Sequence, residues 1–167
     1  MSAADPDFRY YEGIFLYDRD VSRMKKRLLI SACLIGINCK YDGGNNYISE
    51  VERLKEKYEL IPVCAEIFGG LPTPRIPSEQ RSGKVWNREG EEVTEKFLRG
   101  AEEVGRTARF FECGVALLKE RSPSCGYGEI YDGTFSGHLT RGNGIAAAKL
   151  SDMGLQIYGE SEIRKLL

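Results

Sequence analysis

Histidine is almost absent from this sequence, with His138 as the single one among 167 residues. Catalytic zinc usually takes histidine among its ligands, and structural zinc often takes two close pairs of cysteines. His138 lies in a glycine-rich segment, and the spacing Cys-x-x-Cys does not occur in the chain. A zinc hydrolase is therefore the weakest of the metal-dependent functions that the 5 cysteines suggest.

Long apolar runs and a strong net charge are also missing. No apolar run approaches the roughly 20 residues that span a bilayer, and the polar start, Met1–Asp7, lacks the pattern of a signal peptide. The formal net charge of −1 gives no overall attraction to nucleic acid or to a membrane. These absences predict a cytoplasmic protein, in which cysteines are more often free, metal-bound or catalytic than paired in disulfides.

The length and the composition, with 41% apolar and 29% charged residues, fit one ordinary globular domain. We expect this single domain at residues 25–167, as a monomer or a homodimer. Residues 1–24 carry too many aromatic side chains for a solvated tail. We expect them to form an N-terminal extension that is docked or partly disordered.

Short apolar runs that alternate with helical patterns predict the fold. Strands are expected at 28–32, 60–63, 115–118 and 155–158. Helices are expected at 49–58, 145–153 and 160–167, and a further helix from Thr94 that stops at Gly114. A small hairpin is expected at 84–93. Continuous apolarity is typical of strands buried on both faces, as in parallel sheets. We therefore predict an α/β, Rossmann-like parallel sheet of about four to five strands with flanking helices. Pro62 is expected near an edge of the sheet because it lacks an N–H donor.

Three of the cysteines follow predicted strands. Cys33 and Cys64 come directly after strands, and Cys125 lies in the loop after the third strand. The carboxyl ends of strands in an open parallel sheet line its ligand crevice, so these thiols are expected to meet there. Iron–sulfur clusters bind thiolates almost exclusively. Cys113, at the end of a helical pattern, is expected to be a buried apolar residue.

The number of thiolates decides what an iron–sulfur cluster does. Three thiolates on a 4Fe–4S cluster would leave one iron open to a substrate, as a Lewis acid. Cys39, in the same loop as Cys33, would instead be a fourth ligand that closes the cluster. The first arrangement indicates an enzyme, and the second a non-catalytic iron–sulfur or sulfur-carrier protein. The residues themselves leave both open.

Polar side chains are expected beside the thiols. Glu66 lies two residues beyond Cys64 and would activate a water. Ser122 and Ser124 flank Pro123, and either would donate a hydrogen bond to a developing charge.

Cationic and glycine-rich segments complete the expected crevice. Arg75 lies in a loop stiffened by prolines. Arg141 and Asn143 belong to a glycine-rich turn that leads into a predicted helix, where free N–H groups would suit a phosphate.

Six segments, in order along residues 26–160, resemble a family long known only as a domain of unknown function, some of whose members are thiouracil desulfidases. The segments are Ser31–Leu34, Cys39–Gly43, Pro62–Glu66, Gly69–Arg75, Lys119–Gly126 and Ile130–Gly133. One departure stands beside Glu66, where this chain has Ala65 and the family usually has proline.

The resemblance implies a Rossmann-like domain that holds a 4Fe–4S cluster through Cys33, Cys64 and Cys125. It implies that the remaining iron binds the sulfur of a thiocarbonyl pyrimidine. By the same resemblance, Glu66 would act as the acid and base, and Ser122 would supply a hydrogen bond.

The hypothesis for the whole chain is a non-redox desulfuration. The substrate would be 2-thiouracil, 4-thiouridine or its monophosphate, and a water deprotonated by Glu66 would attack the carbon that bears sulfur. Sulfide would then leave, with help from Ser122. Arg75 and Arg141 would hold a ribose phosphate, which would favour a thionucleotide over a free base.

Overall fold

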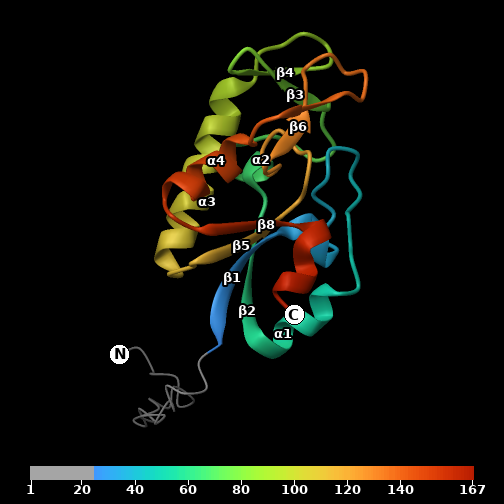
Figure 1. Cartoon of the computed structure of the whole chain (residues 1–167). Helices are drawn as coiled ribbons and strands as arrows, with labels where there is room; N and C mark the ends of the chain where they lie inside the picture. The colour runs from blue at the N-terminus through green and yellow to red at the C-terminus, as the bar shows by residue number, and fades with distance from the viewer. Residues whose placement is uncertain (1–24) are drawn as a thin grey trace, which may run out of the picture.

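A computed structural model describes residues 25–167 and contains a four-stranded parallel sheet (Figure 1). The strand order is β2-β1-β5-β8, and every pairing in this sheet is parallel. The strands are β1 (Lys26–Ser31), β2 (Tyr58–Val63), β5 (Val115–Leu118) and β8 (Gln156–Gly159). The helices are α1 (Val51–Lys57), α2 (Ala65–Phe68), α3 (Thr94–Phe110), α4 (Ile145–Asp152) and the 3₁₀ helices η2 (Ala32–Ile35) and η3 (Glu160–Lys165).

Both faces of the sheet are covered, which explains the continuous apolar runs. Leu29 faces α3 and α4, whereas its neighbours Leu28 and Ile30 face the side of α1 and η3. Each side has its own buried apolar cluster, and Figure 1 shows α3 and α4 together on one side. The predicted α/β parallel sheet with flanking helices is confirmed, with four strands.

The strand order places a ligand crevice at the carboxyl ends of β1 and β5. The chain leaves β1 toward β2 on one side and returns to β5 on the other side of β1. Connections that diverge in this way open a crevice above the strand ends. Pro62 lies in β2, which is an edge strand, as the sequence predicted.

Two hairpins lie beyond these strand ends (Figure 1). The hairpin predicted at 84–93 does form, since Trp86 bridges antiparallel to Glu92 and the N–H of Asn87 donates to the carbonyl of Glu91. A further turn precedes it, because the first hairpin pairs β3 (Ser78–Arg81) with β4 (Lys84–Asn87). Ser82 and Gly83 both have positive φ, as a two-residue type I′ turn requires. The second pairs β6 (Glu129–Tyr131) with β7 (Leu139–Arg141), in a segment predicted only as turns.

The helix boundaries also differ from the prediction at several ends. Helix α3 begins at Thr94, as predicted, and the Thr94 hydroxyl accepts a hydrogen bond from the N–H of Val85. Helix α3 ends at Phe110, before Gly114. The last segment is the 3₁₀ helix η3 instead of an α-helix.

No helix within residues 25–167 is long and apolar enough to cross a membrane. The expected N-terminal extension, residues 1–24, lies outside the described residues.

Helix α2 packs on α3 through two glycines. A Cβ on Gly100 would lie 1.9 Å from the carbonyl oxygen of Ala65, and one on Gly69 would lie 2.0 Å from that of Lys96. Backbone therefore meets backbone at this contact, and no side chain fits between the helices. Because Glu66 is the second residue of α2, the contact fixes its height above the sheet.

Gly100→Ala is expected to lower the free energy of unfolding by about 1–3 kcal/mol, because the new methyl group meets rigid backbone. Denaturant unfolding measures this change. Gly105→Ala in the same helix is the matched control, since its Cβ would meet only the flexible ends of Met153 and Lys149. That control should be neutral or stabilising by up to about 1 kcal/mol. Equal effects of the two substitutions would contradict the packing argument.

Candidate active site

A cavity of about 520 Å³ lies at the carboxyl ends of β1, β2 and β5. It contains most of the residues that the sequence singled out, which come from three separate strand ends. These residues are Cys33, Cys39, Cys64, Glu66, Arg75, Ser122 and Cys125. The structure thus brings the predicted thiols, carboxylate and hydroxyl to one cavity.

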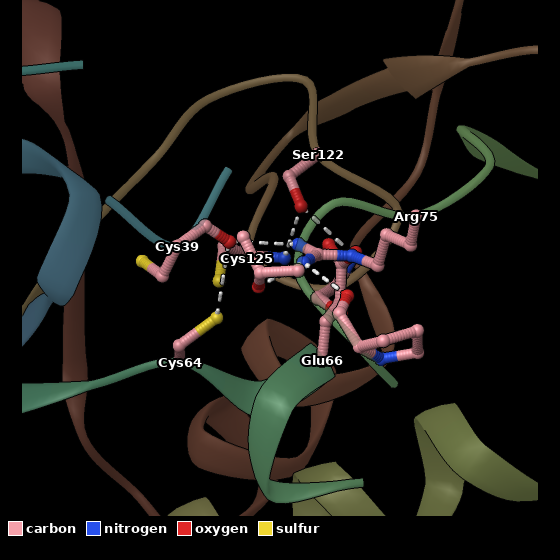
Figure 2. Close-up of polar contacts among 9 residues, drawn as sticks. Cys39, Cys64, Glu66, Arg75, Ser122 and Cys125 are labelled. Atoms are coloured by element: carbon pink, nitrogen blue, oxygen red, sulfur yellow. Dashed lines mark hydrogen bonds and ion pairs between the residues drawn. The ribbon is translucent and has the colours of Figure 1, made fainter. Parts of the chain in front are cut away.

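Each of the three predicted ligand cysteines is held by a different local structure. Cys33 lies in η2 directly after β1, and Cys64 lies between β2 and α2. The loop of Cys125 is shaped by Ser122, whose Oγ accepts the N–H groups of Ser124 at 3.1 Å and of Cys125 at 3.2 Å. Ser122 therefore positions the third thiol and also lines the cavity (Figure 2).

Cys39 is a neighbour of two of these thiols. The Cys39 thiol, as a hydrogen-bonding neighbour of both sulfur atoms, is the main cause that lowers the pKa of Cys64 to about 6 and lowers the pKa of Cys33, although burial opposes both shifts. The same hydrogen bonds raise the pKa of Cys39. Burial raises the pKa of Cys125. Thiolates are the metal-binding form of cysteine, so the lowered pKa values of Cys33 and Cys64 favour metal binding. Cys113 lies in the apolar cluster beneath α3 and α4.

Glu66 and Arg75 form a buried ion pair (Figure 2). Arg75 Nε donates to Glu66 Oε2 at 2.5 Å. The side chain of Arg75 is only 5% exposed and that of Glu66 is 16% exposed. Arg75 Nη2 also donates to the carbonyl of Cys39 at 3.0 Å, and its backbone N–H donates to the carbonyl of Tyr41 at 2.7 Å. Arg75 lines the cavity as predicted, but its guanidinium binds protein groups.

The glycine-rich turn before α4 has a different role from the one expected. The N–H of Ile145 donates to the carbonyl of Pro123, and those of Ala146 and Ala147 donate to the carbonyl of Ser124. The first turn of α4 therefore binds the loop that carries Cys125, and these N–H groups are not free for a phosphate. The close fit needs Gly144, because a Cβ there would lie 2.3 Å from the carbonyl carbon of Ser124.

Three residues expected to bind substrate lie outside the cavity lining. Ser124 is 1% exposed, and its Oγ is buried with no hydrogen-bond partner among residues 25–167. Asn143 accepts the N–H of Gly128 at 2.8 Å and so ties the two ends of the second hairpin together. Arg141 is exposed on β7.

Several further residues line the cavity that sequence reasoning did not single out. They include Lys40, Asn46, Glu79, Arg88, Lys119 and Arg121. Asn46 forms a hydrogen bond that lowers the pKa of Cys33. Glu79 and Arg88 come from the first hairpin and the turn after it, whose position depends on contacts distant in sequence. Lys119 and Arg121 could have been predicted to line the cavity, because the short segment Lys119–Ser122 directly follows β5.

Arg75→Met is expected to lower the free energy of unfolding by about 3–5 kcal/mol, because it leaves the carboxylate of Glu66 buried without its partner. Thermal or urea unfolding measures the loss. Adding Glu66→Gln to this variant should restore part of it, because the unpaired charge is removed.

The matched control is Lys84→Met, which breaks the exposed pair of Lys84 with Glu92. Exposed pairs stabilise proteins little, so this variant should unfold close to the wild-type protein. A loss in Arg75→Met no larger than in Lys84→Met would contradict the importance of the buried pair.

Comparison with known proteins identifies the family. The model of the 2-thiouracil desulfurase family matches residues 28–162. An uncharacterised protein of Bacillus subtilis, YbbK, is 36% identical over 150 residues, which cover 84% of this chain and 99% of that protein. A solved structure named as the [4Fe-4S]-dependent thiouracil desulfidase TudS is 38% identical, with a TM-score of 0.80, over 85% of this chain and 95% of that one. This protein therefore belongs to the 2-thiouracil desulfurase family.

Proposed function

We propose that this protein is an iron–sulfur-dependent desulfidase, which replaces the sulfur of a thiolated pyrimidine with oxygen and releases sulfide. The observation that carries the proposal is one cavity whose lining includes three cysteines from three strand ends, with Glu66 and Ser122 beside them. Membership of the family supports thiouracil as the substrate class. The structural neighbour that is named as [4Fe-4S]-dependent supports the cofactor.

The donor set suits a cluster better than a single ion. No group of three or more His, Cys, Asp or Glu side chains in residues 25–167 is arranged to hold one metal ion. In a 4Fe–4S cluster each thiolate binds a different iron, so Cys33, Cys64 and Cys125 would hold it without converging on one point. When bound, the cluster would supply an open iron that acts as a Lewis acid toward the thione sulfur.

Glu66 is suited to activate the water. Arg75 binds Oε2, and within the described part of the chain no donor reaches Oε1, which is left for the proton of a water. The ion pair and the packing of α2 on α3 fix the carboxylate toward the cavity. The attacking water gives its oxygen to the carbon as the bond to sulfur breaks, so thiocarbonyl and water become carbonyl and hydrogen sulfide. No electrons are gained or lost.

Ser122 is suited to donate a hydrogen bond. Its Oγ already accepts two backbone N–H groups, so its own proton points away from them. A donor held in this way stabilises negative charge that develops on a substrate in the cavity. Deleting the hydroxyl would also loosen the loop of Cys125.

Reconstitution under anaerobic conditions tests the function. The wild-type protein should bind about four iron and four sulfide per chain and release sulfide from 2-thiouracil. Cys33→Ala, Cys64→Ala and Cys125→Ala should each abolish both properties. Cys113→Ala is the matched control, because this thiol lies in the core away from the cavity, and it should keep both. Sulfide release that survives loss of any of the three ligands would overturn the proposal.

Glu66→Gln and Cys39→Ala separate the enzyme from the non-catalytic carrier. Glu66→Gln should keep the cluster and lower kcat by about 100-fold or more, since a positioned general base contributes this much. Cys39→Ala should keep the cluster and the turnover. A carrier would show the opposite pattern, with a cluster that needs Cys39 and a function that does not need Glu66.

For the finer substrate class we propose that a thionucleotide phosphate is bound by Arg88 and Arg121. Both line the cavity, and neither has an ion-pair partner among the described residues. The other cations of the lining are occupied, because Lys119 pairs with Glu160, Lys40 pairs with Asp42 and Arg75 pairs with Glu66. Arg88 lies 5.7 Å from the centre of the Phe135 ring, which helps to fix it.

Arg88→Met and Arg121→Met should lower kcat/KM for 4-thiouridine monophosphate by about 10-fold each, with little change for 2-thiouracil. The reason is that only the nucleotide carries a phosphate for these cations to bind. The exposed Arg141→Met is the matched control and should change neither value. Equal losses on both substrates would contradict a phosphate site at these residues.

A further inference from the structure

A buried carboxyl group in the cavity wall has no part in the reaction described above. Glu79 lies in β3, is 8% exposed and lines the cavity. It forms no ion pair with any residue in the range 25–167. Buried carboxylates are costly unless they are paired or hydrogen-bonded, so its surroundings show what stabilises it.

One of its two oxygens accepts two backbone N–H groups. Oε2 of Glu79 accepts from Gly133 at 3.0 Å and from Phe135 at 2.9 Å, both in the segment between β6 and β7. These contacts fix the side chain between the two hairpins. They also satisfy Oε2 and fix which way Oε1 points.

The second oxygen remains available. Within the described residues no donor reaches Oε1. It is not fully buried either, because the one fully buried side-chain oxygen or nitrogen without a partner in residues 25–167 is Oγ of Ser124. Glu79 lines the cavity, and its Oε1 keeps some accessible surface and receives no donor from residues 25–167. Oε1 is therefore the candidate hydrogen-bond acceptor for a molecule bound in the cavity.

We propose that Glu79 is a specificity-determining residue, which accepts a hydrogen bond from an N–H or O–H donor of the pyrimidine substrate. This inference rests on the proposed function. A thiouracil ring carries N–H groups beside its thiocarbonyl carbon, and a nucleoside adds the hydroxyls of ribose. A substrate that lacks the donor displaces water from Oε1 and leaves this one oxygen without a partner, which is unfavourable.

Glu79→Gln keeps the shape of the side chain but replaces the hydrogen-bond acceptor Oε1 with a hydrogen-bond donor. The amide oxygen of glutamine is the atom that can accept from the N–H groups of Gly133 and Phe135, so it must take the place of Oε2. The NH₂ group then takes the place of Oε1. The cavity would present a donor where it had an acceptor, and the backbone N–H groups would stay satisfied.

The test measures binding of uracil and of uridine to the anaerobically reconstituted protein, by calorimetry, for the wild type, Glu79→Gln and Glu129→Gln. Binding of uracil and uridine does not require turnover, so sulfide release from 2-thiouracil by the wild type reports separately on the proposed function. Glu129 is an exposed carboxylate outside the cavity and serves as the matched control. Thermal unfolding of both variants should match the wild type.

Glu79→Gln is expected to weaken binding by about 10-fold or more, and Glu129→Gln is expected to leave it unchanged. A loss with both ligands identifies the ring N–H that they share as the donor. A loss with uridine alone identifies a ribose hydroxyl, and a loss with uracil alone identifies the ring N–H that ribose replaces in uridine. Glu79→Gln with wild-type affinity for both ligands, or a wild type that binds neither, would overturn the proposal.

Discussion

The hydrogen bonds of one arginine hold the candidate site together. Arg75 joins the loop after β1, through the carbonyls of Cys39 and Tyr41, to the start of α2 after β2, through the carboxylate of Glu66. The segments that carry two of the three predicted ligand thiols, Cys33 and Cys64, are thereby fixed relative to each other. The guanidinium group binds Cys39 and Glu66 together because it presents several donors in one rigid plane, and the backbone N–H of Arg75 adds the contact to Tyr41. The same contacts remove Arg75 from the cations that are free to bind a substrate.

The third thiol is fixed by a separate set of contacts. The loop of Cys125 turns around the hydroxyl of Ser122, and its carbonyl groups cap the first turn of α4. A helix N-terminus that serves in this way satisfies its own N–H groups and orders the loop at once. The side chain of Gln80 adds hydrogen bonds from the first hairpin to the carbonyls of Pro123 and Asn143. The cavity thus has one wall fixed by an arginine and another fixed by a helix end.

The sequence predicted those parts of the structure that depend on local pattern. Continuous apolar runs such as 28–32 indicate parallel strands that are buried on both faces. Because Cys33, Cys64 and Cys125 follow such strands, they were expected together at the carboxyl ends of the sheet. The role of the turn before α4 was not predictable, because the partners of its N–H groups lie about 20 residues earlier in the chain. Glu79 was missed for the same reason, since the N–H groups of Gly133 and Phe135 reach it from a hairpin that shows no clear strand pattern.

Pro62 has a consequence beyond its place in the sheet. Among residues 25–167, strand β2 pairs only with β1, so it is an edge of the sheet. An exposed strand edge is a template onto which a strand of another molecule can be added. Proline has no N–H to offer there and interrupts the row of donors. The residue that marks β2 as an edge in the sequence thus also makes that edge a poorer template for strand addition by a second copy of the protein.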